Sequence, residues 1–197
     1  MPASSKEPSP QPEFYIVVDI EASGPNPSNY AMLSIGACTL DEPRCTFYVE
    51  LQPDKDDYLE ESMKTNQLSF EALRQEGLPP KIAMQQFASW VQGILPEGAR
   101  PIFTAFNAPF DWMFINDYFH RYLGQNPFGH SALDIKAFYM GLRGVSWRET
   151  AHKNIDSKYI KKKELTHHAL SDAMDEADIF QAMLAEAKQK GMQEEEE

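Results

Sequence analysis

The most constraining feature of the sequence is an apolar run that ends in two acidic residues. Residues 14–18 (FYIVV) are aromatic or β-branched, which predicts a buried β-strand, and Asp19 and Glu21 follow directly. Side chains at i and i+2 of a strand project from the same face, so both carboxylates face one way and Ile20 the other. Two like charges on a half-buried face repel unless a cation or a shared proton relieves them. The pair therefore indicates either a metal-binding strand end or solvated acids before the turn at 23–25.

The remainder of the chain alternates predicted strands and helices. Strands are predicted at 14–18, 31–40, 45–51, 102–106 and 131–138, the last running into a helix, with further helices beginning at Pro80, spanning 109–123 and spanning 170–184. The predicted strands 31–40 and 45–51 form a hairpin joined at 41–43. The acidic segment 53–66 is predicted to be a loop. This succession favours an α/β fold with a mixed central β-sheet flanked by helices.

Composition bounds the organisation of the chain. With 197 residues, 42% of them hydrophobic and 24% charged, it is typical of one globular domain, which we place at 13–188 between solvated ends at 1–12 and 189–197. No apolar run approaches the length of a membrane span, and the Pro/Ser-rich start is not typical of a signal peptide. Cys38 and Cys45 indicate neither a disulfide framework nor a zinc site. We therefore expect a cytoplasmic protein without membrane contacts.

A second acidic position follows the predicted strand at 102–106. In the segment 107–111 (NAPFD), Pro109 suits the first helical position, and Asp111 then lies in the first turn. The helix dipole alone can account for an acid at this place. Asp111 is therefore a candidate site residue only in combination with the others.

A third position lies at the start of the last predicted helix, in the segment 166–173 (THHALSDA). Asp172 borders the apolar stripe of this helix and is expected to face the edge of the sheet. His167 lies at or just before the helix start, from where it can reach over the site. The acids that follow, Asp175, Glu176 and Asp178, are predicted to form a solvated helix face.

Together the three places bring four carboxylates to two strand ends and one helix. Oxygen ligands without a Cys/His cluster suit Mg²⁺ or Mn²⁺ better than Zn²⁺. Converging carboxylates of this kind are typical of sites that hold two ions about 3.5–4 Å apart for in-line displacement at phosphorus. The sequence therefore predicts a two-metal site acting on a phosphoester.

The three motifs, in this order, resemble those of the DEDDh exonucleases, the group that contains ribonuclease T, oligoribonuclease and the proofreading subunit of DNA polymerase III. They are Asp19-Ile20-Glu21, the block 107–111 and the block 167–172 (HHALSD), and the resemblance extends over residues 14–185. It implies a ribonuclease H-like fold. It also implies stepwise 3′-to-5′ hydrolysis of single-stranded RNA or DNA with a free 3′ end.

The resemblance also implies roles for single residues. By position, Asp19, Glu21, Asp111 and Asp172 bind two Mg²⁺ or Mn²⁺ ions. His167 is the general base, because it and not His168 matches the family's His-x-Ala-x-x-Asp spacing. Residues 22–24 read Ala-Ser-Gly where the family often has Thr-Thr-Gly or Ala-Thr-Gly. Since this loop faces the terminal nucleotide in such enzymes, the nucleoside preference stays open.

Substrate binding has to overcome a net charge of −12. The segment 143–168 carries seven basic against three acidic residues and contains Lys161, Lys162 and Lys163 beside His167. This segment is either a local electrostatic funnel for a phosphate backbone or a lysine-rich solvated loop. Asn107 is a further candidate for substrate contact. Phe110, and less so Trp112, is either a platform for a base or a core aromatic.

Two alternatives to an exonuclease remain from the sequence. One is a non-catalytic module of the same fold that binds nucleic acid or a protein, against which the presence of all five polar site residues argues. The other is a different phosphoesterase that uses the same metals, such as an endonuclease or a nucleotide phosphatase. The sequence leaves the choice between RNA and DNA open, and it fits a monomer as well as a homodimer.

Overall fold

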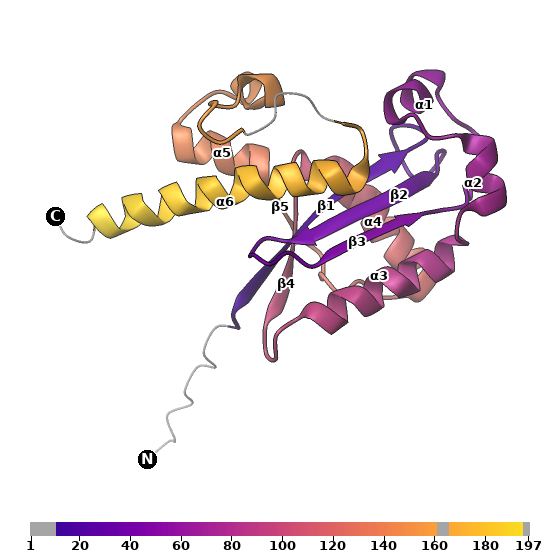
Figure 1. The fold of residues 1–197 in the computed structure, drawn as a ribbon, viewed down its shortest axis with the longest axis horizontal. Coiled ribbons are helices and arrows are strands. Elements are labelled where there is room, and N and C mark those ends of the chain that lie inside the picture. Colours follow the sequence, from indigo (N-terminus) through magenta and orange to yellow (C-terminus); the bar gives the residue numbers. More distant parts are fainter. Residues whose placement is uncertain (1–10, 161–165, 195–197) are drawn as a thin grey trace, which may run out of the picture.

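The computed structural model describes residues 11–160 and 166–194 and shows a five-stranded sheet with helices on both faces (Figure 1). The strands are β1 (Glu13–Ala22), β2 (Met32–Thr39), β3 (Thr46–Glu50), β4 (Arg100–Ala105) and β5 (Ala132–Asp134). The α-helices are α1 (Glu60–Asn66), α2 (Phe70–Glu76), α3 (Pro80–Ile94), α4 (Ala108–Leu123), α5 (Ile135–Arg143) and α6 (Ala169–Glu194). Two short 3₁₀ helices, η1 (Trp147–Thr150) and η2 (His152–Asn154), follow α5.

The sheet is mixed, as predicted, and its strand order is β3-β2-β1-β4-β5. The central strand β1 pairs antiparallel with β2 and parallel with β4. Because β1 and β4 run in the same direction, their carboxyl ends meet at one edge of the sheet, where open α/β sheets place their ligands. This register brings the acids at the end of β1 beside the loop that leads into α4.

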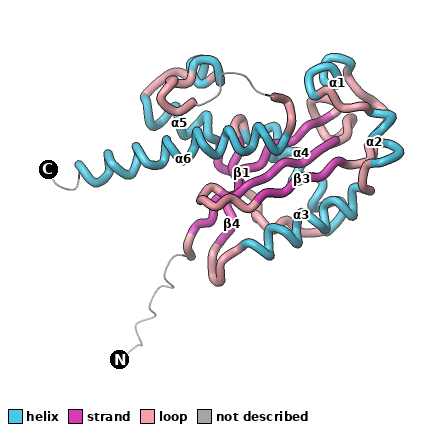
Figure 2. Tube along the Cα trace, in the orientation of Figure 1, coloured by secondary structure: helices cyan, strands magenta, loops and turns pink. Residues whose placement is uncertain are grey.

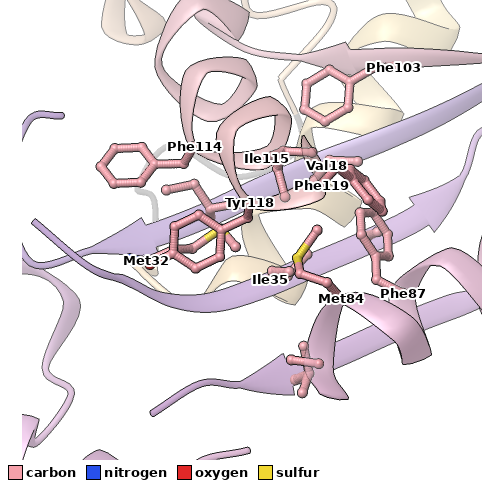
Figure 3. Packing of buried hydrophobic residues seen from close by; sticks show 14 of the residues in the cluster. Val18, Met32, Ile35, Met84, Phe87, Phe103, Phe114, Ile115, Tyr118 and Phe119 are labelled. Atoms are coloured by element: carbon pink, nitrogen blue, oxygen red, sulfur yellow. Dashed lines mark hydrogen bonds between the residues drawn. The ribbon is translucent and has the colours of Figure 1, made fainter. Parts of the chain in front are cut away.

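The two faces of the sheet have separate hydrophobic cores. Val18 and Ile20 of β1 belong to the core under α3 and α4, whereas Val17 belongs to the core under α5 and α6. Figure 2 shows α6 and α3 along different sides of the strands. Figure 3 shows the first of these cores, in which Phe87 of α3 and Tyr118 of α4 pack over the strands. Since alternate residues of a strand point to opposite faces, Asp19 and Glu21 lie on the α6 side with Val17.

A glycine allows α6 to approach the sheet closely. Gly36 of β2 pairs with Asp19 of β1, and a Cβ added to Gly36 would lie 2.1 Å from the carbonyl carbon of Ala169 and from the backbone nitrogen of Leu170. Only a residue without a Cβ fits there. The amino end of α6 is therefore held directly over the acidic end of β1.

Most predicted elements are confirmed, with several differences in extent. The helix α2 was not predicted, and the predicted strand 131–138 is a strand only at Ala132–Asp134, because the residues that follow form α5. The segment 53–66, predicted as a loop, contains the seven-residue helix α1, and α6 runs to Glu194, beyond the predicted start of the tail at 189. Lys161, Lys162 and Lys163 lie outside the described residues. Both cysteines are free thiols. Within the described ranges, none of the helices combines the length and the apolar character needed to cross a membrane.

Candidate active site

The carboxyl end of β1 supplies two half-buried acids. Asp19 and Glu21 lie on the sheet face that α6 covers, and this edge of the sheet also contacts α1 (Figure 1). The backbone N–H of Ile20, between the two acids, donates a hydrogen bond to the Asp111 carboxylate at 3.1 Å. This bond ties the first turn of α4 to β1, and it places Asp111, which is only 4% exposed, beside the pair as predicted.

The amino end of α6 brings the remaining predicted residues. Asp172 is 4% exposed, and its Oδ1 accepts hydrogen bonds from the backbone N–H and the hydroxyl of Thr166, both at 2.9 Å. His167, next to Thr166, has a left-handed backbone with φ 54°. One ligand atom each from Glu21, His167 and Asp172 lies within 4.8 Å of the others. Three of the five predicted residues thus converge on one point, with Asp19 and Asp111 next to them.

Burial and mutual repulsion disfavour charge on these acids. Burial raises the pKa of Asp19 well above its usual range, and the nearby carboxylates raise it further. Burial first, and then the charges of Asp172 and Asp111, raise the pKa of Glu21 to about 8. The pKa of Asp111 is also raised to about 8, chiefly by burial and against the hydrogen bond from Ile20. Neighbouring carboxylates that repel one another when ionised are stabilised by a bound cation. Their oxygen atoms suit hard divalent cations such as Mg²⁺ or Mn²⁺.

A fifth carboxylate, Glu176, belongs to the cluster, so its predicted place on a solvated helix face is wrong. It is 4% exposed, and its Oε2 accepts a hydrogen bond from the backbone N–H of Phe106 at 3.1 Å. Burial and the charge of Asp111 raise its pKa. Glu176 follows Asp172 by four residues, which puts both on the same side of α6. This four-residue spacing was the feature of the sequence that could have placed Glu176 in the cluster.

The two neighbouring acids on α6 also differ from the solvated face that was predicted. Asp178 pairs with the guanidinium of Arg44 at 2.6 Å, and Asp175 is half-buried. The Arg44 side chain is itself 7% exposed. This part of α6 therefore packs against the β2–β3 turn.

Asn107 begins α4 in a left-handed conformation, with φ 70°, and is exposed. Its backbone N–H donates to the Asp134 carboxylate at 3.1 Å, and its side-chain oxygen accepts from the Lys136 ammonium at 3.3 Å. Asp134, which sequence reasoning missed, also caps α5 by accepting from the backbone N–H of Lys136. The end of a predicted strand followed by a helix was the signal for this cap.

A cavity of about 290 Å³ opens beside Glu21. Phe110 is half-buried in its wall, together with Gly24, Pro25 and Leu59. In contrast, Trp112 packs edge-on against the core residue Phe103, with 5.1 Å between ring centroids. The structure therefore keeps Phe110 as a candidate for base contact and places Trp112 against the core.

At Ser23 the chain departs from the family pattern, and the Ser23 hydroxyl forms its hydrogen bonds within the protein. It donates to the carbonyl of Asp57 and accepts from the backbone N–H of Ala31, both at 2.9 Å. Ser23 is completely buried. The loop therefore uses this serine to hold its own shape.

Glu21 also lines a smaller cavity of about 220 Å³, together with His167, His168 and Tyr48. The ring of His168 stacks on Tyr48, with centroids 4.6 Å apart and an angle of 19° between the planes. His168 is not part of the group that converges with Glu21 and Asp172. The structure thus places His167, and not His168, beside Glu21 and Asp172.

A third histidine near the site, His152, was not predicted. Its ring lies edge-on to Phe106, with 5.6 Å between centroids. Burial lowers the pKa of His152, and the charges of Asp172 and Asp175 act in the opposite direction. The η1–η2 segment therefore borders the acidic cluster on the side of the β4–α4 loop.

Comparison with known proteins assigns the family. Residues 14–184 match the model of the Rv2179c-like 3′-5′ exoribonuclease domain. A curated relative, the 3′-5′ DNA exonuclease Cap18 of Escherichia coli, is 46% identical over 169 residues, which cover 85% of this chain and 90% of the relative.

Solved structures share the fold at low sequence identity. The nuclease domain of 3′hExo, a DEDDh family member bound to rAMP, superposes with a TM-score of 0.71 at 15% identity and covers 87% of this chain and 92% of that one. Escherichia coli exonuclease I in complex with a dT13 oligonucleotide gives a TM-score of 0.64 at 16% identity, with 92% of this chain and 43% of that one covered. The predicted ribonuclease H-like fold of the DEDDh exonucleases is confirmed, and a family of this kind implies divalent metal ions. The chain belongs to the Rv2179c-like 3′-5′ exoribonuclease domain family and is a 3′-5′ exonuclease.

Proposed function

We propose that the protein removes nucleotides one at a time from the 3′ end of single-stranded nucleic acid, with two Mg²⁺ or Mn²⁺ ions held by Asp19, Glu21, Asp111 and Asp172. The observation that carries the proposal is the convergence of Glu21, His167 and Asp172 within 4.8 Å, next to the half-buried Asp19 and the buried Asp111. Bound ions would lower the pKa of a water molecule and offset the charge that develops on the phosphate.

The protein's part in this reaction is to hold the acids in a fixed arrangement. The N–H of Ile20 fixes Asp111, and Thr166 fixes Asp172 with two hydrogen bonds. Such anchored carboxylates need little rearrangement when a substrate arrives. Glu176 adds a fixed point, because it holds the backbone of Phe106 at the entrance to the β4–α4 loop.

His167 is the proposed general base. It lies within reach of Glu21 and Asp172, and its left-handed backbone directly precedes α6. A neutral imidazole there can take a proton from the attacking water. The same nitrogen could instead bind an ion, and the loss of affinity for Mn²⁺ in a His167→Ala variant would indicate that role.

The cavity beside Glu21 and Phe110 is the proposed place of the terminal nucleoside. Phe110 and Leu59 offer apolar contact to a base, and Glu21 offers a carboxylate to the sugar. Because the hydroxyl of Ser23 is occupied inside the loop, we expect Ser23 to play no part in choosing between nucleosides. Asn107 and the lysines at 161–163 remain predicted substrate contacts.

The relatives differ in what they act on: the family description names an exoribonuclease, and the 46%-identical relative is named a DNA exonuclease. We expect DNA to be degraded faster, because that relative covers most of the chain at substantial identity. A cytoplasmic location stays a prediction from the sequence, and the choice between a monomer and a homodimer stays open.

The test is digestion of 5′-labelled single-stranded DNA and RNA, side by side, with Mg²⁺, Mn²⁺ or EDTA. We expect a ladder that shortens by one nucleotide from the 3′ end and depends on the cation. A circular single strand distinguishes the alternatives, since an endonuclease opens it and an exonuclease leaves it intact. Asp19→Asn should be inactive, and Asp41→Asn, on the exposed β2–β3 turn, is the matched control. Binding without cleavage by the wild-type protein would instead identify a non-catalytic module.

A further inference from the structure

Trp147 is exposed in a way that is uncommon for tryptophan. It begins η1, and half of its surface (50%) is accessible. Tryptophan is large and mostly apolar, so it is usually covered. The Lys136 ammonium lies 4.3 Å from the centre of its ring. An open indole next to a cation is the combination that proteins use to hold single-stranded nucleic acid.

Contacts connect Trp147 and Lys136 to the edge of the sheet that carries the acidic cluster. The ammonium of Lys136 donates to Asn107 at 3.3 Å, and Asn107 directly follows Phe106, whose N–H is held by Glu176. On the other side, His152 of the same η1–η2 segment contacts the ring of Phe106. Trp147 therefore lies two contacts away from the loop that borders the acidic cluster.

The surroundings of Trp147 offer positive charge on a chain whose net charge is −12. Arg148 and Lys153 are both exposed in the same segment. Arg143 and Lys158 nearby contribute less, because both form ion pairs with Glu186. Arg148 and Lys153 are thus exposed cations in the segment of Trp147, where the exposed Glu149 offsets one of the two charges.

We propose that Trp147 and Lys136 form a binding subsite for a nucleotide that lies on the 5′ side of the scissile bond in single-stranded substrate. The base stacks on the indole, and the ammonium neutralises the adjoining phosphate. The inference rests on the proposed function. The terminal nucleoside occupies the cavity beside Glu21 and Phe110 in this proposal, and the strand continues past the β4–α4 loop, which Lys136 and the η1–η2 segment contact.

The chemistry of this subsite sets what it recognises. Every base has an aromatic face, so stacking on Trp147 is independent of sequence and of the sugar. The subsite therefore contributes to affinity for longer strands and leaves the choice between RNA and DNA to other contacts.

The test is the dependence of KM on strand length, measured with oligodeoxythymidylates of two to eight nucleotides. For the wild type we expect KM to fall at the length that reaches Trp147. In Trp147→Leu this fall should disappear, so KM for the longest strand rises roughly tenfold while kcat stays unchanged. Trp147→Phe should restore most of the fall, because phenylalanine keeps an aromatic face.

Lys136→Met tests the phosphate contact. It should lower by about one the slope of log KM against log salt for the long strands. Lys81→Met, which removes an exposed cation on α3, is the matched control and should leave that slope unchanged.

Two results would overturn the inference while the proposed function stands. One is an identical length dependence in the wild type and Trp147→Leu. The other is an equal loss of kcat in Trp147→Leu at every length, which indicates a role in holding the β4–α4 loop. If the wild type degrades no strand of any length, it is the proposed function that fails. Should Trp147→Leu not fold, the salt slope of Lys136→Met decides.

Discussion

The two faces of strand β1 carry side chains of opposite character. On one face, Val18 and Ile20 pack beneath α3 and α4, where large side chains such as Phe87 and Tyr118 are fully buried. On the other face, Val17 is followed by Asp19 and Glu21, which lie beneath the start of α6. One strand therefore serves an aromatic core with its even-numbered residues and a carboxylate cluster with its odd-numbered ones.

This difference shows where the protein gains stability and where it gives stability up. Burial of aromatic side chains stabilises the α3–α4 face. On the α6 face, ionised acids are disfavoured by burial and by mutual repulsion, which raise the pKa values of Asp19 and Glu21. Functional sites commonly break the rules that stabilise the rest of a fold. Substitutions on the two faces should accordingly affect different measurements.

The largest effect should come from the α6 face. Asp19→Ala should reduce cleavage to background, because Asp19 is proposed to bind metal directly. The same variant should melt no lower than the wild type in EDTA, because it removes one of several repelling charges. Activity assays and thermal melts check both statements. Near-wild-type turnover, or a large loss of stability without metal, would show that Asp19 belongs to the supporting core.

A parallel variant at Asp172 requires a different substitution. Its Oδ1 accepts two hydrogen bonds from Thr166, which alanine would break and asparagine can keep. We expect Asp172→Asn to be inactive and to keep the wild-type melting temperature in EDTA.

His167→Ala should cost about 10²–10⁴ in kcat, the usual contribution of a positioned general base. His168→Ala is the matched control: its ring stacks on Tyr48, so its loss should be far milder. Equal losses in the two variants would mean that His167 is not the base.

On the α3–α4 face the expected effect is on stability alone. Phe87 contacts the rings of Phe47, Trp90, Phe119 and Phe128, with centroids 5.1–6.1 Å away. Phe87→Ala should lower the free energy of unfolding by about 3–5 kcal/mol, since it leaves a cavity in a dense core. Urea unfolding measures this loss. The activity per folded molecule should stay close to that of the wild type, and a loss of kcat would show that the two faces are coupled.

The sequence predicts well those features that repeat or stand next to a strong local signal. The apolar run before Asp19, the proline before Asp111 and the apolar stripe that Asp172 borders define their elements, and all three acids lie at the same edge of the sheet. The helices α1 and α2 escaped prediction because each has only seven residues, too few to show a helical repeat of apolar positions.

Other parts of the site could not be derived, because they depend on contacts between distant segments. His152 and Trp147 come close to the cluster only through the path of the chain after α5. Asp134 supports Asn107 across 27 residues of sequence. Glu176 is the exception, since its four-residue spacing from Asp172 was visible and only its burial was misjudged.

The smallest predicted effect concerns how far the ionisation of Glu21 destabilises the metal-free protein. The pKa of Glu21 is raised from its ordinary value of 4.5 to about 8 in the folded protein. A group with a raised pKa stabilises the fold below its ordinary pKa, and this contribution is lost as the pH rises toward the folded value. Glu21 should therefore destabilise the metal-free protein progressively between about pH 5 and pH 8.

The comparison with Glu21→Gln isolates this contribution, since His152 and the other titrating groups are present in both proteins. In EDTA, the variant's melting temperature should exceed that of the wild type by an amount that grows from pH 5 to pH 8 and is on the order of a few degrees at pH 8. With saturating Mn²⁺ the order should reverse, because the wild type then gains the ion's binding free energy through Glu21. A difference that stays constant with pH would mean that Glu21 is charged at little cost, and the contrast between the two faces of β1 would then rest on Asp19 alone.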